Sequence, residues 1–288
     1  MNEPKTHTLN LPGTTLTYDV RESESGSSEP ALLMIGAPMD ASGFRTLAGY
    51  FPDRTVVTYD PRGVGRSPRS DGVTAATPDE HAEDLHQLIC ELDTAPVDIF
   101  ASSGGAVNAL ALVVRHPEDV RVLVAHEPPL ARLVPDRAEA LAAMEDIHET
   151  YQRAGLGPAM AKFLAITRVK GPIPQDFSGQ APNPADFGLP TEDDGTRDHP
   201  LLGPHMVYVS GYEPDFDSLR GASTRIVIAG GAESEDTLPY RAAVAVAERL
   251  GTKVVVFPSH HGGFHEQGDP DAFAATLRPV LTNGTQQP

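Results

Sequence analysis

Two adjacent serines precede two glycines in the stretch "VDIFASSGGAVNALAL" (97–112), after an apolar run and before a helical pattern. A serine at a sharp strand-to-helix turn can be raised above the helix N-terminus and attack a carbonyl carbon. The residues two positions away on either side must be small, because strand and helix come close there. Centring this turn on Ser103 gives Ala101 and Gly105 as flanks, whereas centring it on the first serine gives Phe100. We therefore expect Ser103 to be a nucleophile; the alternative is that it only caps the helix.

A serine nucleophile needs a base, and the stretch "VVVFPSHHGGFHEQGDP" (254–270) supplies three histidines after the last apolar run. His261, which two glycines follow, best fits a base placed a few residues beyond a final strand. His260 is the alternative, and we expect His265 to be a solvated residue of the following turn. No cysteine or carboxylate accompanies these histidines at a recognised metal spacing, so we expect no metal.

The base in turn needs a carboxylate that orients it. Glu233 lies in "RIVIAGGAESEDTLPY" (225–240), three residues after Gly230, where a strand is expected to end. We expect Glu233 to have this role. Asp236 in the same loop is an alternative, and Glu127, which follows the apolar run "VLVAH", is another.

A developing oxyanion needs hydrogen-bond donors. The backbone N–H of Gly104 would lie at the N-terminus of the helix that follows Ser103, where the helix dipole adds to its effect. A second donor is expected in the loop after "LLMIG" (32–36), from the backbone of Ala37. Pro38 has no N–H and is expected to fix the turn.

Apolar runs alternate with helical patterns along most of the chain, which predicts a mainly parallel sheet covered by helices on both faces. Between residues 130 and 221 the pattern is first helical and then rich in proline, glycine and aspartate. We interpret this segment as a helical lid over the carboxyl ends of the strands. The residues expected to line an apolar pocket there, or else to form the lid's own core, are Met39, Met144, Phe163, Leu164, Met206, Tyr208 and Tyr212.

The composition limits the possible partners. The 288 residues carry a formal net charge of -18, from 40 acidic against 22 basic side chains, so nucleic acid and anionic lipid are not expected partners. No apolar run is long enough to span a bilayer and the N-terminus has no apolar signal core. The single cysteine, Cys90, suits a reducing compartment. We expect a cytoplasmic monomer or homodimer that acts on a small molecule.

Together these residues resemble the α/β-hydrolase superfamily. The turn "YDPRGVGRS" (59–67) is similar to that family's Asp-x-Arg-Gly-x-Gly-x-Ser turn, in which we expect Asp60 and Arg62 to be structural. Gly36-Ala37-Pro38 resembles its oxyanion segment, with Ile35 where histidine is usual. The resemblance implies an eight-stranded, mostly parallel sheet, formed by residues 1–129 and 222–288, with a helical cap at 130–221.

The resemblance also implies a cofactor-free serine mechanism. Ser103 would attack a carbonyl, His261 would act as base and then acid, Glu233 would orient it, and Ala37 and Gly104 would hold the oxyanion. The leading interpretation is a hydrolase of an ester or lactone with a small to medium apolar body, acting through an acyl-enzyme. The alternatives are a C–C bond hydrolase, a proline-type aminopeptidase whose amine-binding carboxylates lie in "TEDDGTRD" (191–198), and a non-catalytic binding protein.

Overall fold

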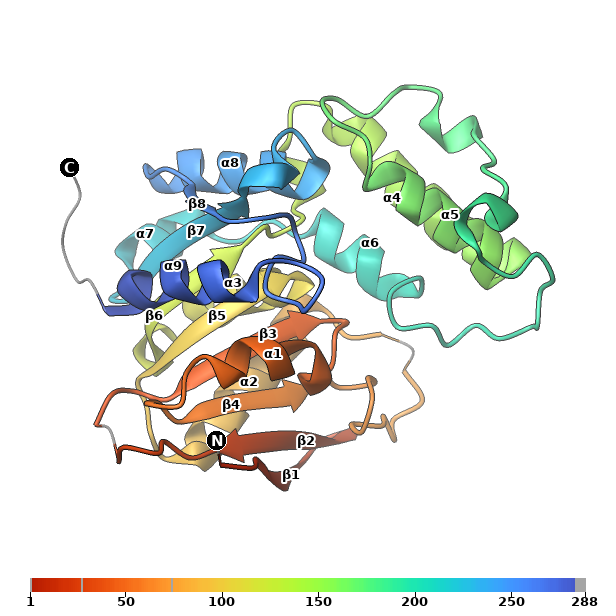
Figure 1. Ribbon diagram of the computed structural model, residues 1–288. Coiled ribbons are helices and arrows are strands. Elements are labelled where there is room, and N and C mark those ends of the chain that lie inside the picture. The colour runs from red at the N-terminus through yellow and green to blue at the C-terminus, as the bar shows by residue number, and fades with distance from the viewer. Residues whose placement is uncertain (1, 27, 74, 283–288) are drawn as a thin grey trace.

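Eight strands form a single sheet in the order β1-β2-β4-β3-β5-β6-β7-β8 (Figure 1). The computed structural model describes residues 2–26, 28–73 and 75–282. The strands are β1 (Lys5–Leu11), β2 (Thr14–Arg21), β3 (Leu32–Ala37), β4 (Val56–Asp60), β5 (Val97–Ser103), β6 (Val120–His126), β7 (Arg225–Gly231) and β8 (Val255–Phe257).

The first two strands are antiparallel, and the rest of the sheet is parallel. β1 and β2 form a hairpin, β2 pairs antiparallel with β4, and every later pairing is parallel. All six residues of β3 are buried, as expected for a strand covered on both faces. The predicted eight-stranded, mostly parallel sheet is therefore confirmed. Parallel strands end at one edge, so β3, β5, β6 and β7 deliver their following loops to the same place.

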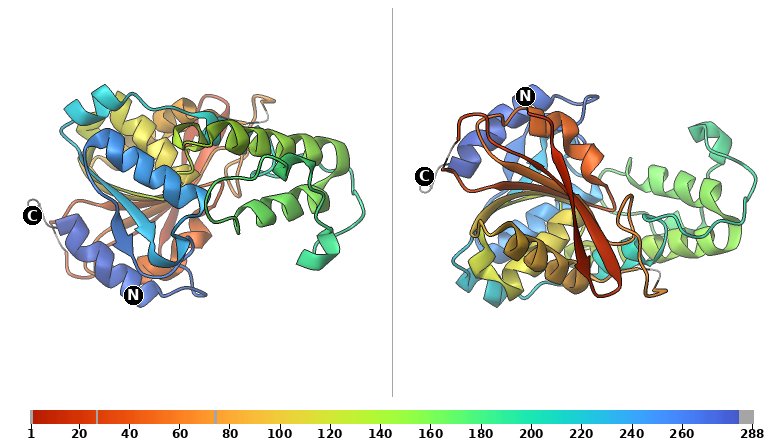
Figure 2. Two further views of the ribbon diagram at one scale, coloured as in Figure 1. Left: turned by 90° about the horizontal axis from the view of Figure 1, so that it is seen from above. Right: turned by 90° about the horizontal axis from the view of Figure 1, so that it is seen from below.

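Helices cover both faces of the sheet, and Figure 2 shows the resulting layers. One apolar core lies beneath α2 (Pro78–Leu92), α3 (Gly104–Arg115) and α8 (Leu238–Leu250). The other lies beneath α1 (Arg45–Gly49) and α9 (Pro270–Thr282). The α2 helix starts with a capping box in which the Thr77 and Glu80 side chains each bond the other's backbone N–H. No described helix is both long and apolar enough to cross a membrane.

The chain between β6 and β7 is mainly helical and extends over the carboxyl edge of the sheet (Figure 1). Its helices at that edge are α4 (Arg137–Ala154), α5 (Leu156–Ile166) and α6 (Pro204–Gly211), whereas α7 (Phe216–Gly221) lies at the opposite end of the sheet, where β7 starts (Figure 1). A bridge between Lys170 and Thr237, with the hydrogen bond from Gly171 N–H to the Asp236 carbonyl, ties this segment to the loop after β7. The boundaries 130 and 221 remain a prediction, but this placement puts α6 above the loops that carry the candidate residues.

Candidate active site

Ser103 occupies a strained turn at the end of β5. Its backbone has φ 57° and ψ -129°, a left-handed φ that side chains other than glycine rarely adopt, and α3 starts at the next residue. A Cβ atom built on Gly105 would lie 2.7 Å from the Ile35 carbonyl oxygen, which explains why this flank must be small. The turn therefore has the backbone geometry that the spacing around Ser103 predicts.

His261 is held by Glu127. Its Nδ1 lies 2.5 Å from Oε2 of Glu127, whose side chain is completely buried. The other oxygen of this carboxylate accepts a hydrogen bond of 2.7 Å from the N–H of Gly231, at the end of β7. Burial is the largest single influence and would raise the pKa of Glu127, but the hydrogen bond from His261, the neighbouring imidazoles and the N–H of Gly231 together outweigh it, and the pKa falls to about 2. An ionised carboxylate thus faces Nδ1, which leaves Nε2 as the nitrogen for proton transfer.

The expectation that Glu233 orients His261 is therefore wrong in this structure. Glu233 is exposed, and its backbone N–H donates to the carbonyl of Ser259 rather than its side chain reaching the imidazole. Asp236 is also exposed and makes no hydrogen bond with His261. Glu127 follows β6, which is adjacent to the strand of Ser103. The sequence signal was its position directly after a strand that is buried at all but one residue, where a carboxylate is buried and needs a partner.

Ser103 and His261 line the same cavity, which has a volume of about 450 Å³. Ala37 and Gly104, the expected oxyanion donors, lie in the same wall. Within the described part of the chain, the Ser103 hydroxyl makes no hydrogen bond. Catalytic hydrogen bonds are often long in a free enzyme and shorten when substrate binds. The position of Ser103 and His261 in one cavity wall is therefore compatible with proton transfer between them.

The rest of the cavity wall is mainly apolar and comes largely from the segment between β6 and β7. Of the residues expected there, Met144, Phe163 and Met206 are present, with Ile166, Leu201 and Val209 added. The cationic Arg168 and Lys170 and the anionic Glu233 also contribute to the wall.

Four expected lining residues lie elsewhere. Tyr208 is 43% exposed. It lies two residues after Met206, which on a helix is a rotation of about 200°, so the two side chains lie on nearly opposite faces of α6. Met39 packs against the core under α1 and α9, and Leu164 does not reach the wall. The Tyr212 hydroxyl donates to Asp79 instead. The stretch 191–198 also does not line the cavity, and its Asp193 pairs with Arg197.

Residues 32–276 match the alpha/beta hydrolase family. The chain belongs to this family. It is 32% identical over 264 residues to the uncharacterized hydrolase YraK of Bacillus subtilis, with 89% of each chain covered. Among solved structures it resembles an esterase of Exiguobacterium antarcticum (TM-score 0.67, 18% identity, 98% and 100% covered). It also resembles an alpha/beta hydrolase from a Medee basin deep-sea metagenome (TM-score 0.71, 15% identity, 98% and 99% covered). These two structural likenesses show the fold alone.

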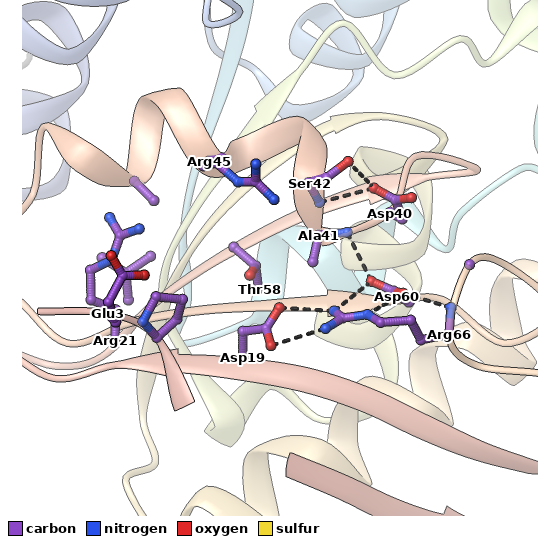
Figure 3. A pocket seen from close by; sticks show the side chains of 14 residues that line it. Glu3, Asp19, Arg21, Asp40, Ala41, Ser42, Arg45, Thr58, Asp60 and Arg66 are labelled. Carbon is purple, nitrogen blue, oxygen red and sulfur yellow. Dashed lines mark hydrogen bonds and ion pairs between the residues drawn. The ribbon is translucent and has the colours of Figure 1, made fainter. Parts of the chain in front are cut away.

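The hydrolase chain has a second, larger cavity beside β2 and β4, with a volume of about 630 Å³ (Figure 3). Its central charged side chains are paired with one another, because Arg66 binds both Asp19 and Asp60. Asp60 also accepts hydrogen bonds from the N–H groups of Ala41 and Arg66. Each acid in this centre has a structural partner, and none of the expected catalytic residues lines this cavity. The 450 Å³ cavity therefore remains the candidate active site of the hydrolase.

Arg62 is the remaining charged residue of the turn that resembles the family motif. It pairs with Asp84 of α2 through two hydrogen bonds, and both side chains are largely buried. Asp60 and Arg62 thus act as the structural residues that the sequence suggests, since they tie the turn after β4 to its surroundings.

One group of described residues has ligand types suited to a metal ion. Glu83, His86 and His116 offer atoms that all lie within 4.8 Å of one another. The two imidazoles are stacked, however, with centroids 3.7 Å apart and an angle of 7° between their planes. Nitrogen lone pairs lie in the ring planes, so those of parallel rings do not converge on one ion. The group is therefore not arranged to hold a metal.

Proposed function

We propose that this hydrolase cleaves an ester or lactone with a small to medium apolar body, using Ser103 as nucleophile. The observation that carries the proposal is the hydrogen bond between His261 and the buried Glu127, at a cavity whose floor holds Ser103 on a strained turn. A serine, an imidazole and an ionised carboxylate around one apolar cavity are the groups that acyl transfer requires.

The reaction would proceed in two steps. Nε2 of His261 removes the Ser103 hydroxyl proton while Oγ attacks the carbonyl carbon, and the negative oxygen accepts hydrogen bonds from Ala37 and Gly104. The imidazolium, stabilised by Glu127, gives its proton to the leaving alcohol as the ester C–O bond breaks. Water then attacks the acyl-serine by the same route, and releases the carboxylic acid and free Ser103.

The cavity supports a neutral, mainly apolar substrate body. Its wall is formed largely by Met144, Phe163, Ile166, Met206 and Val209, and about 450 Å³ lies within the usual range for small-molecule sites. A proline-type aminopeptidase would need a carboxylate for the substrate amine. The acids at 191–198 do not line the cavity, and the carboxylate that does, Glu233, shares the wall with the cations Arg168 and Lys170, which favours the ester interpretation.

The test is hydrolysis of p-nitrophenyl acetate and butyrate, together with labelling by a fluorophosphonate probe that mass spectrometry localises. We expect turnover and labelling of Ser103 in the native chain, and loss of both in Ser103→Ala. The adjacent Ser102→Ala is the matched control, because the Ser102 hydroxyl bonds His126 in the buried core and does not line the cavity. This variant should keep the label.

A well-folded native protein without turnover or label would instead indicate a binding protein. Turnover of proline p-nitroanilide in preference to either ester would favour the aminopeptidase. Label on Ser102 would indicate that Ser102, and not Ser103, is the nucleophile.

A further inference from the structure

His205 is a buried imidazole at the active site that the mechanism above does not use. It lies in the first turn of α6 and is 8% exposed. It lines the cavity of Ser103 and also a small cavity of about 40 Å³ behind it, and Ala37 is the other residue that lines both. His205 and Ala37 thus form the partition between these two spaces, where α6 meets the loop that follows β3.

The geometry around Gly104 shows how closely the imidazole approaches the expected oxyanion donors. A Cβ atom built on Gly104 would lie 2.5 Å from the Ala37 carbonyl oxygen and 3.0 Å from Nε2 of His205. The imidazole nitrogen and the carbonyl oxygen therefore both face the backbone of Gly104. The His205 side chain, which comes from α6, thus lies directly beside the peptide groups that would hold the oxyanion.

The protonation state of His205 suits it to act as a neutral donor. Burial lowers its pKa to about 4, against the opposing effect of a hydrogen bond to the Ala37 carbonyl. At neutral pH the ring is therefore neutral and has one N–H, and the Ala37 carbonyl is the acceptor that lies beside it. His81 packs edge-on against the other side, with ring centroids 5.9 Å apart and planes at 87°, so the imidazole has little freedom to turn.

The loop after β3 needs such a contact at its near end. Its far end is anchored, because the N–H of Ala41 donates to the Asp60 carboxylate (Figure 3). At the near end, Ile35 is 1% exposed within the apolar core and offers no polar group. The backbone of Ala37 is therefore fixed on one side by its sheet pairing with β5 and on the other by the His205 imidazole.

We propose that His205 is a positioning residue that fixes the Ala37 backbone at its carbonyl group and so keeps the Ala37 N–H in its oxyanion-binding orientation. Acylation of Ser103 then requires α6 to be packed against the core. The inference rests on the proposed ester hydrolysis and adds a dependence on a residue from the segment between β6 and β7. Under this proposal the apolar wall provides substrate binding, whereas transition-state stabilisation depends on the His205 imidazole beside Ala37.

The experiment compares His205→Leu with His205→Gln on p-nitrophenyl butyrate. Removing an oxyanion donor outright costs about 10²–10³-fold in kcat, so loosening one should cost about 10- to 100-fold. We expect this loss in kcat for His205→Leu, with KM changed less than about threefold, and an equal loss in the rate of fluorophosphonate labelling. Glutamine places an amide N–H near the position of Nε2, and should restore kcat to within about threefold of native. His7→Gln, on the exposed β1, is the control for histidine replacement elsewhere.

The outcomes separate this inference from the proposed function. Native kcat in His205→Leu overturns the inference, and so does an equal loss in the leucine and glutamine variants, which would indicate packing alone. A loss that appears in KM but not in labelling rate would make His205 a substrate-binding residue instead. If Ser103→Ala retains full turnover, the proposed function fails, and the inference fails with it. Thermal unfolding of each variant checks that the leucine chain is folded.

Discussion

Replacing Glu127 by glutamine tests the corrected assignment of the acid most directly. The carboxylate is completely buried and faces Nδ1 of His261 at 2.5 Å. Glutamine keeps an oxygen that can accept from the N–H of Gly231, so the fold should survive. What is lost is the negative charge beside the imidazolium that forms during acylation, and the acceptor that fixes the tautomer of His261.

The magnitude follows from burial. Leaving one member of a buried ion pair without its partner costs about 3–5 kcal/mol. The His261 side chain is 42% exposed, so water screens part of this loss, and the lower end applies. At 1.36 kcal/mol for each factor of ten, about 3–4 kcal/mol lowers kcat by about 100- to 1,000-fold. The variant Glu127→Asp keeps the charge but shortens the side chain by one methylene, so it should lie between glutamine and native.

The assay is kcat and KM on p-nitrophenyl butyrate, with Glu233→Gln as the matched control. Both glutamates were candidates for the same role, and both replacements remove one charge near the cavity. Glu233 makes no hydrogen bond with His261, so its variant should stay within about threefold of native. Near-native activity in Glu127→Gln, or an equal loss in Glu233→Gln, would refute the reasoning from buried charge.

Two further predictions concern the same region. In Gly104→Ala, the added Cβ would meet the Ala37 carbonyl oxygen at 2.5 Å, so the oxyanion backbone must shift. We expect kcat to fall at least about tenfold and the melting temperature to fall as well, and an unchanged kcat would contradict this close approach. Burial lowers the pKa of His126 from 6.5 to about 4. The unfolded chain then binds more protons between these values, so this residue makes stability rise with pH from about 4 to 6.5, by up to about 3 kcal/mol. Urea unfolding across that range should show a smaller slope in His126→Leu than in the native chain, and an equal slope would count against the buried neutral imidazole.

The proposed nucleophile and base could be selected from the sequence because local features point to them. A turn at Ser103 needs small flanks at fixed positions, and Ala101 and Gly105 provide them whatever surrounds the turn. His261 follows the last strand in the chain, which leaves few choices for a base. The sheet could be predicted for a similar reason, since fully apolar runs such as β3 have no stable place other than a sheet covered on both faces.

The acid and part of the cavity wall could not be predicted because they depend on tertiary placement. Glu127, Glu233 and Asp236 all follow predicted strands, and only the three-dimensional course of the loops shows which carboxylate meets His261. Tyr208 was misplaced for a similar reason, because α6 has only eight residues and its rotational phase is set by packing. His205 was missed entirely, since a lone histidine before an apolar stretch carries no signal of what it will face.

The loop after β7 still contributes to the site, but through its backbone. The N–H of Gly231 donates to the Glu127 carboxylate, and the N–H of Glu233 donates to the Ser259 carbonyl in the segment that leads to His261. A side chain on Gly231 would also collide with that segment, since a Cβ built there lies 2.7 Å from the Ser259 oxygen. The loop thus fixes the acid and the base relative to each other without supplying the charge itself. Because backbone groups do this work, the Glu233 side chain is left free at the cavity wall, where a change in its charge should alter substrate preference more than turnover.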